Sequence, residues 1–476
     1  MQNILKEALS PTNFRQQAHD LVDLLADYLE KSQARTYETV IPYKDPEENY
    51  QFWKNDLEAG TEANPTRLFE EIIEQSTHLH HPKYMGHQVV PPIPLAATAG
   101  FLSEFLNNGM AVYEMGLVSN PMERIVTEWM NKKLGYDSNS NGLITSGGTL
   151  GNLTALLTAR AMKAPSDVWS DGHAEKLAII VSEEAHYCVD RAARVMGLGS
   201  AGIIKIPTDE AFKMRTDLLE QYYQQATAAG FYVFAIIGSG SSTSTGSHDD
   251  LNAIADFAET HNLWFHTDAA HGGGAIFSAK YKYLLAGIER SDSVVIDFHK
   301  MMMTPALATA VLYKNGSDAF QTFQQKAQYL WSNQTSQDWF NSGKRTFECT
   351  KLGMSIKVYA LLKTYSDLLF EANINTLYDL GAEFASLLKS NPRFELSLEP
   401  SCNIVCFRYL KSGIETNYLN AEIRKKMLEK GDFYIVQTTL REKTYLRVSL
   451  MNPLTTTQDL NDLLDAIETI AQQITL

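Results

Sequence analysis

The sequence predicts an α/β protein with a mainly parallel sheet in its larger domain and a smaller α+β domain at its C-terminal end. Short apolar runs with the length of buried strands alternate with helical stretches through the middle of the chain, a pattern typical of βαβ units. After residue 354 the pattern changes to long helices followed by short alternating strands. We therefore expect three parts, residues 1–82, 83–353 and 354–476.

The composition is that of an ordinary globular protein, with 44% hydrophobic and 20% charged residues. The formal net charge of -15 argues against nucleic acid and anionic membranes as partners, because both call for basic patches. No run of about 18 apolar residues occurs, and the first residues contain no signal-like apolar region, so we expect a cytoplasmic protein. The four cysteines show no paired metal spacing and fit free thiols in a reducing compartment.

The N-terminal part is predicted to be helical. Apolar side chains recur on one face of a helix over residues 14–29, namely Phe14, Leu21, Val22, Leu25 and Tyr28. This helix is too short to bury that face alone, so it packs either on a partner subunit or on its own domain. Residues 43–64 are polar and rich in turn formers, which predicts a linker before a second helix over residues 65–76.

Four histidines lie close together after the second helix: His78, His80, His81 and His87. We expect no metal site here, because no carboxylate or cysteine stands at ligand spacing beside them. His80 and His81 are also adjacent, and adjacent side chains of an extended chain do not easily converge on one ion.

A glycine turn opens a helix in the next part of the chain. Amphipathic helices are predicted over residues 95–107 and 121–134, and Ser146-Gly147-Gly148-Thr149 then begins a helix that runs to Met162. Glycines at a helix N-terminus let backbone amides converge on an anion. A Gly-Gly-Thr turn is weak evidence on its own, but its position before a helix favours an anion site.

Two predicted strands end in polar loops. Residues 177–181 form an apolar run that leads to His186, and an isolated histidine at a strand end is by default structural. Residues 231–237 form another run, followed by a serine-rich stretch over residues 238–249. Its hydroxyls suit hydrogen bonds to a ligand, but such a stretch is more often a flexible loop.

A carboxylate and an amine follow the next two strands. Asp268 comes after the apolar run at residues 263–265, and His299-Lys300 follows the run at residues 294–296. Ligand chemistry collects at strand ends in α/β sheets. Lys300 has apolar neighbours, which favours an amine whose pKa burial depresses and which can form a Schiff base. Taken alone, either residue is more often structural than catalytic.

The C-terminal part contains one further candidate, Arg447, on its last predicted strand. Its guanidinium could bind a carboxylate through paired donors or form a surface ion pair, and the sequence leaves both open. The remaining elements are predicted as strands over residues 306–313, 403–409, 433–437 and 444–449 and helices over residues 354–369, 374–390 and 457–474.

The run Asp268-Ala269-Ala270-His271-Gly272-Gly273-Gly274, followed by Asp297-Phe298-His299-Lys300, resembles the group II pyridoxal-phosphate-dependent amino acid decarboxylases. The resemblance covers nearly the whole chain. This family holds aromatic amino acid, glutamate, cysteine sulfinate, diaminobutyrate and lysine-type decarboxylases. It implies an aspartate-aminotransferase-like type I fold, pyridoxal 5'-phosphate as cofactor, and a homodimer with clasping N-terminal helices and shared active sites.

The resemblance also assigns roles to residues of this chain. Lys300 would form the Schiff base, Asp268 would hold the pyridine nitrogen and His186 would stack on the ring, so these are the expected catalytic residues. Cofactor binding is expected from Ser146, Gly147, Gly148, Thr149, His186, Thr243, Asp268, Ala270, His299 and Lys300. Substrate binding is expected from Gly86, His87, Gln88 and Arg447.

The implied reaction is α-decarboxylation of an L-amino acid to the corresponding amine and carbon dioxide. Arg447 and the His87-Gln88 pair favour a polar, diamino or acidic substrate. Four aromatic residues could equally line a pocket for an aromatic substrate: Tyr84, Phe101, Trp331 and Trp339.

The chain departs from the family in one loop. Members commonly carry a tyrosine there that supplies a proton to the product, whereas residues 330–345 contain none and Tyr329 better matches the base of the loop. In the family, loss of this tyrosine can divert the reaction towards oxygen and an aldehyde, so an aldehyde synthase is the alternative. A non-catalytic protein that kept the fold is disfavoured, because a scaffold needs none of Lys300, Asp268 and His186.

Overall fold

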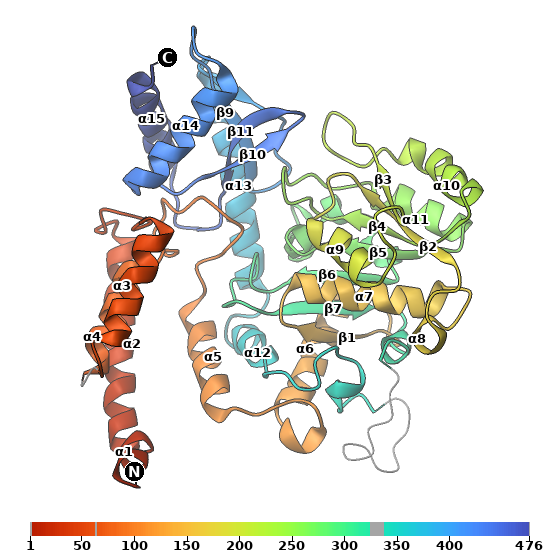
Figure 1. Ribbon diagram of the computed structural model, residues 1–476, viewed down its shortest axis with the longest axis horizontal. Helices are drawn as coiled ribbons and strands as arrows, with labels where there is room; N and C mark the ends of the chain where they lie inside the picture. The colour runs from red at the N-terminus through yellow and green to blue at the C-terminus, as the bar shows by residue number, and fades with distance from the viewer. Residues whose placement is uncertain (1, 62–63, 324–337, 476) are drawn as a thin grey trace. The chain divides into compact units, whose positions relative to one another are not determined.

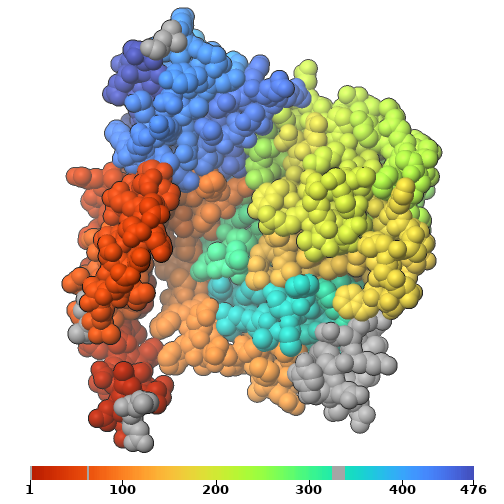
Figure 2. All heavy atoms as spheres, in the orientation of Figure 1, coloured from red at the N-terminus to blue at the C-terminus, as the bar shows by residue number. Residues whose placement is uncertain are grey.

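The computed structural model describes residues 2–61, 64–323 and 338–475 (Figure 1; all heavy atoms in Figure 2). The chain forms two compact units, and each unit combines segments that are distant in the sequence. Unit 1 contains Met1–His87, Glu383–Ser397 and Cys406–Leu476, and unit 2 contains Gln88–Ala382 and Leu398–Val405. The boundary passes through helix α13 (Leu368–Ser390) and through strand β9 (Ile404–Tyr409), whose first two residues belong to unit 2.

Unit 2 is built on a seven-stranded sheet in the described part of the chain, with the strand order β1-β7-β6-β5-β4-β2-β3. β2 pairs in parallel with β3 and β4, β4 with β5, and β5 with β6, whereas β7 runs antiparallel to both β6 and β1. The strands are β1 (Asn141–Thr145), β2 (Lys176–Ser182), β3 (Ile203–Ile206), β4 (Phe231–Ser239), β5 (Trp264–Asp268), β6 (Ser293–Asp297) and β7 (Thr309–Tyr313). The predicted mainly parallel sheet is confirmed.

Helices cover this sheet and make it the core of unit 2. Every residue of β5, β6 and β7 is buried, as in strands that are covered on both faces. Helix α7 packs against β1, β4, β5, β6 and β7, and α6 packs against β1 and β7 (Figure 1). The helices of this unit are α5 (Pro94–Leu106), α6 (Ser119–Leu134), α7 (Gly148–Lys163), α8 (Val168–Asp171), α9 (Tyr187–Val195), α10 (Leu219–Ala228), α11 (Leu251–Thr260) and α12 (Ser355–Tyr365).

The carboxyl ends of β1, β4, β5 and β6 lie at the same edge of the sheet. Ser239 at the end of β4 pairs with Asp268 at the end of β5. Thr309, the first residue of antiparallel β7, pairs on one side with Asp297 and on the other with Thr145. The turns that follow these strands therefore converge at one place.

Unit 1 combines a four-stranded sheet with helices from both ends of the chain. The strand order in the described residues is β10-β11-β9-β8, in which β10 pairs antiparallel with β11 and β8 with β9. Helix α14 packs on β11, and α2 packs on α4. The elements are α1 (Gln2–Ala8), α2 (Pro11–Gln33), α3 (Pro46–Glu58), α4 (Pro65–Gln75), β8 (Phe394–Leu396), β9 (Ile404–Tyr409), α14 (Thr416–Lys430), β10 (Val436–Leu440), β11 (Lys443–Ser449) and α15 (Thr457–Gln473).

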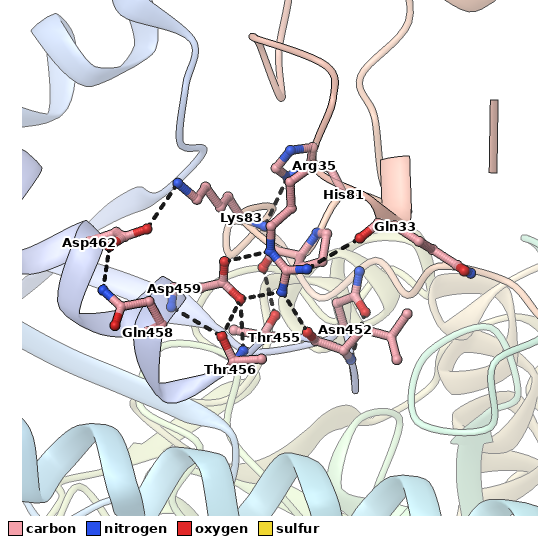
Figure 3. Close-up of polar contacts among 12 residues, drawn as sticks. Gln33, Arg35, His81, Lys83, Asn452, Thr455, Thr456, Gln458, Asp459 and Asp462 are labelled. Atoms are coloured by element: carbon pink, nitrogen blue, oxygen red, sulfur yellow. Dashed lines mark hydrogen bonds and ion pairs between the residues drawn. The ribbon is translucent and has the colours of Figure 1, made fainter. Parts of the chain in front are cut away.

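An ion pair joins the two ends of the chain within unit 1 (Figure 3). Arg35, just after α2, donates from Nε to Asp459 Oδ1 at 2.8 Å and from Nη2 to Asp459 Oδ2 at 2.6 Å. Asp459 also closes the capping box of α15 with Thr456, so one carboxylate ties α2 to the start of α15. Nearby, Lys83 pairs with Asp462 at 3.2 Å.

The predicted linker over residues 43–64 is wrong, because α3 occupies Pro46–Glu58. Its start carries ordinary helix signals: Asp45 caps the N-terminus, Pro46 stands in the first turn, and Glu47 and Glu48 follow. No residue of α3 is buried, and apolar residues such as Tyr50, Trp53 and Leu57 stand among polar residues, so the composition of the segment resembled that of a linker. The strand predicted over residues 306–313 is also shorter than expected, because β7 begins only at Thr309.

The other predicted helices and strands are present within about four residues of their expected bounds, except that α13 begins at Leu368, six residues before the expected start. On α2, the predicted apolar face leaves Phe14, Val22 and Leu25 at least 40% exposed. In the described residues, no helix combines the length and apolar character needed to cross a bilayer.

Replacing Arg35 with methionine should lower the free energy of unfolding by about 1–2 kcal/mol at pH 7, because Asp459 loses two charge-assisted hydrogen bonds. Burial raises the pKa of Asp459, but the bonds from Arg35 and Thr456 outweigh burial and lower it overall. This stabilisation is fully present at pH values above the ordinary carboxyl pKa. It is lost as the pH falls through the lowered pKa of Asp459. The difference between wild type and variant should therefore shrink below about pH 4.

Urea denaturation in neutral and acidic buffer measures this difference. Arg215→Met is the matched control, because the Arg215–Asp217 pair is exposed and should contribute little to the free energy of unfolding. Equal losses in the two variants would contradict a special role of the Arg35–Asp459 pair.

Candidate active site

A pocket of about 250 Å³ lies at the converging strand ends of unit 2. The residues that line it include all ten that were predicted to bind a cofactor: Ser146, Gly147, Gly148, Thr149, His186, Thr243, Asp268, Ala270, His299 and Lys300. The structure therefore brings together residues spread over more than 150 positions of the sequence, from Ser146 to Lys300. Their roles stay predictions.

The glycine turn after β1 forms one wall of the pocket. Gly147 has a φ of +113° and precedes the first residue of α7, a backbone conformation that side chains disfavour. The amides at the start of this helix are free of intrahelical partners and suit a phosphate. Ser146 donates its hydroxyl to Glu348 Oε1 at 2.9 Å, an interaction that the sequence did not predict.

Asp268 supplies a buried carboxylate at the end of β5. It is 7% exposed, and its Oδ1 accepts a hydrogen bond from the Ala270 amide at 3.2 Å. On the same strand, His266 holds the Asn152 side chain of α7 at 2.8 Å, and burial lowers the pKa of His266 to about 4. A neutral His266 therefore fixes α7 against β5 behind the pocket.

His186 caps the N-terminus of α9. Its Nδ1 accepts from the Cys188 amide at 3.3 Å, so a neutral His186 carries its proton on Nε2. Burial lowers the pKa of His186, and the positive charge of Lys300 adds to this effect, although Asp268 opposes it. The ring is therefore neutral at pH 7.

Lys300 is held by a carboxylate that the sequence did not identify as functional. Its Nζ lies 2.9 Å from Oδ2 of Asp297, the last residue of β6. Asp297 is only 2% exposed. Burial acts against the charged amine, but Asp297 and then Asp268 outweigh burial and raise the pKa of Lys300. The expectation that burial depresses this pKa is therefore wrong for the structure, although the flanking Met301 and Met302 are buried as expected.

His299 and Thr309 complete the surroundings of Asp297. The His299 Nδ1 contacts the backbone of Ala308, and its Nε2 lies 3.6 Å from Asp297 Oδ2. Thr309 donates its hydroxyl to Asp297 Oδ1 at 2.5 Å. A signal for Asp297 was available in the sequence, since it stands at a strand end as Asp268 does.

The expected substrate residues are not among the described residues that line this pocket. Gly86, His87 and Arg447 belong to unit 1, and Gln88 is the first residue of unit 2. His87 and Arg447 are electrostatic neighbours within unit 1, where burial and then the charge of Arg447 lower the pKa of His87. Their roles in substrate binding stay predictions.

Three of the four aromatic residues considered for a substrate pocket are not among the described residues that line this one. Tyr84 is buried beside Tyr434 in unit 1, Phe101 is 43% exposed on α5, and Trp339 packs under Arg124. Tyr329, Trp331 and the loop around them lie outside the described residues. Another cavity of about 380 Å³ beside α8 has no lysine or histidine among its described lining residues, so it lacks an amine for a Schiff base.

The residues present fit pyridoxal 5'-phosphate. One pocket offers a lysine amine, a buried carboxylate suited to a pyridine nitrogen, and a helix N-terminus preceded by glycine that suits a phosphate. No group of three or more potential metal ligands occurs in the described part of the chain.

Comparisons with known proteins point the same way. Residues 64–410 match the family described as pyridoxal-dependent decarboxylase conserved domain. An aromatic-L-amino-acid decarboxylase of Bacillus atrophaeus is 26% identical over 98% of this chain and 97% of that protein. An aspartate 1-decarboxylase of Aliivibrio fischeri is 30% identical over 83% and 81% of the two chains.

A solved structure extends the similarity to the fold. It is the glutamate decarboxylase domain of the diaminobutyrate-pyruvate transaminase and L-2,4-diaminobutyrate decarboxylase of Vibrio parahaemolyticus. The two chains are 26% identical and superpose with a TM-score of 0.85 over 98% of this chain and 97% of that one. The predicted type I architecture is thereby confirmed.

Replacing Gly147 with alanine should weaken binding of pyridoxal 5'-phosphate by about 1–2 kcal/mol, or roughly tenfold, because a side chain disfavours the positive φ that shapes the turn. Absorbance titration of the cofactor measures this. Gly172→Ala is the control, since Gly172 also has a positive φ, of +78°, but stands in open space away from the pocket. Equal weakening in both variants would contradict a local role of the turn.

Proposed function

This chain belongs to the pyridoxal-dependent decarboxylase family and is a pyridoxal-phosphate-dependent amino acid decarboxylase, in which we propose that Lys300 is the amine that holds the cofactor. The observation that supports this assignment is the single pocket in which Lys300, Asp268 and the glycine turn meet. The alternative of a non-catalytic scaffold is disfavoured, since a scaffold has no need for these groups at one place.

The remaining roles follow from the chemistry of each group. When bound, the cofactor supplies a protonated pyridine ring that accepts the electrons of the breaking carbon–carbon bond. Asp268 would keep the proton on the ring nitrogen, and the amides of Gly148 and Thr149 would bind the phosphate. The proton on His186 Nε2 is available for donation to a ligand in the pocket.

For the substrate, we favour an amino acid with a polar side chain, either acidic or diamino. The described residues that line the pocket include no phenylalanine, tyrosine or tryptophan. Arg447 has the paired donors that suit a carboxylate, and His87 lies in its electrostatic field. The names of the similar proteins divide between aromatic amino acids, aspartate and diaminobutyrate, so they do not decide the question.

An oxygen-dependent aldehyde synthase is the second candidate. The observation in its favour is the sequence between Leu330 and Arg345, which contains no tyrosine. In that reaction the same carbon dioxide is lost, but molecular oxygen is reduced to hydrogen peroxide and the product is an aldehyde with ammonia in place of the amine.

A panel of L-amino acids, with carbon dioxide, amine and peroxide measured together, tests these assignments. We expect carbon dioxide and amine in equal amounts from an acidic or diamino substrate. Peroxide with little amine would establish the aldehyde synthase instead, and turnover of tyrosine or tryptophan alone would contradict the proposed substrate class.

Lys300→Arg should lower turnover by about a thousandfold or more, because arginine keeps the charge beside Asp297 but cannot form the bond to the cofactor. Lys344→Arg is the control, since Lys344 pairs with Asp338 and does not line the pocket. Undiminished turnover in Lys300→Arg would contradict the assignment of Lys300.

We further propose that the protein is a homodimer with shared active sites. Helix α5 buries Ala96, Ala99 and Ser103 but exposes an apolar face formed by Phe101, Leu102, Phe105 and Leu106, each more than 40% exposed. An apolar surface of this kind usually marks an interaction site. A second copy of the chain is the expected partner, as the family resemblance implies.

Leu102→Glu combined with Leu106→Glu should convert the dimer to monomers, because the negative charges buried at such an interface would remain unpaired. Sedimentation velocity at micromolar concentration measures this. Leu368→Glu is the control, because Leu368 is 68% exposed at the start of α13. A wild-type protein that sediments as a monomer would contradict the proposal.

A further inference from the structure

The carboxylate of Asp297 is buried next to the amine proposed to hold the cofactor. Its Oδ2 lies 2.9 Å from Lys300 Nζ, its Oδ1 accepts from Thr309 at 2.5 Å, and His299 Nε2 lies at 3.6 Å. With 2% exposure, the carboxylate exchanges protons with water only poorly. The Lys300 side chain is 20% exposed, so water is a second acceptor, but Asp297 Oδ2 at 2.9 Å offers the shortest route by which Lys300 can lose its charge.

The same carboxylate lies directly behind the glycine turn after β1. Thr309 of β7 pairs with both Asp297 and Thr145, which brings the end of β6 close to the start of α7. A Cβ atom on Gly148 would lie 3.2 Å from Asp297 Oδ1 and 3.3 Å from Oδ2. A phosphate at this turn would thus stand near a buried negative charge, and two such charges repel strongly at low dielectric.

We propose that Asp297 accepts a proton from Lys300 during the step in which the cofactor binds to the cofactor-free enzyme. One Nζ–H bond of the ammonium breaks and an O–H bond forms at Asp297 Oδ2, while the electron pair stays on Nζ. The transfer gives an amine that can attack the cofactor's aldehyde, and a neutral acid beside the phosphate. This inference rests on the proposed role of Lys300.

The charges around the pair are consistent with this exchange. Burial raises the pKa of Asp297, but Lys300 and then His299 outweigh burial and hold it below its ordinary value. Once Lys300 is neutral, the larger of these two opposing charges is lost and burial favours the protonated acid. Among the described residues, the other titratable groups that line this pocket are Asp268 and His271 after β5 and His186 and Cys188 at the start of α9, while the adjoining Thr309 and Gly148 carry no charge.

The pH dependence of cofactor loading tests the proposal. In the wild type the pair holds one proton across the neutral range, so the fraction with a neutral amine is constant and the loading rate should be flat between about pH 7 and 9. In Asp297→Asn the amine must lose its proton to water. Its loading rate should rise about tenfold per pH unit until Lys300 is deprotonated.

Stopped-flow absorbance after addition of pyridoxal 5'-phosphate to enzyme stripped of cofactor gives both profiles. A flat profile in Asp297→Asn would overturn the proposal. A steep profile in the wild type would also overturn it, and this measurement does not depend on whether a variant folds. Asp292→Asn is the control and should keep the flat profile, because Asp292 accepts from the Phe265 amide at the opposite end of the strands.

The two proposals fail in different ways. If Lys300→Arg still forms a bond to the cofactor that borohydride reduces to a stable amine, the assignment of Lys300 is wrong. The inference about Asp297 then falls with it. If the bond requires Lys300 but Asp297→Asn and wild type share one profile, Lys300 keeps its role and only the proton transfer to Asp297 is overturned.

Discussion

The order of the strands in unit 2 is the constraint on which the site depends. Antiparallel β7 lies between β1 and β6, so its first residue, Thr309, stands beside the last residues of both neighbours. This places the glycine turn after β1 next to the lysine segment after β6. Parallel pairing of β5 with β6 and β4 adds Asp268 at the same edge. The pocket is thus assembled by sheet topology, while the loops supply its chemistry.

In the pocket, the attraction between Lys300 and Asp297 offsets the cost of burying their two charges. Burial alone would disfavour charge on Lys300 and Asp297, yet at 2.9 Å each favours the charged form of the other. Removal of one partner would leave the other buried without compensation. Events at Lys300 are therefore coupled to Asp297, and through Asp297 to the neighbouring glycine turn.

Much of the fold and the cofactor pocket could be predicted from the sequence. Strands around Asp268 and Lys300 are apolar runs with clear boundaries, and the glycine turn has a helix behind it. The family resemblance then linked these segments. What failed were two features that the local pattern does not reveal: the pKa of Lys300 is set by Asp297, and helix α3 is mostly polar and buries no residue. The packing of the N-terminal segment on the C-terminal helix α15 in unit 1 likewise depends on contacts such as Arg35–Asp459.

The most direct test of the account is to locate the bond between protein and cofactor. Reduction of the holoenzyme with borohydride, followed by proteolysis and mass spectrometry, identifies the modified lysine. The account predicts a phosphopyridoxyl group on the peptide that contains Lys300. Modification of another lysine, such as Lys344 or Lys351, or of none, would contradict the central assignment.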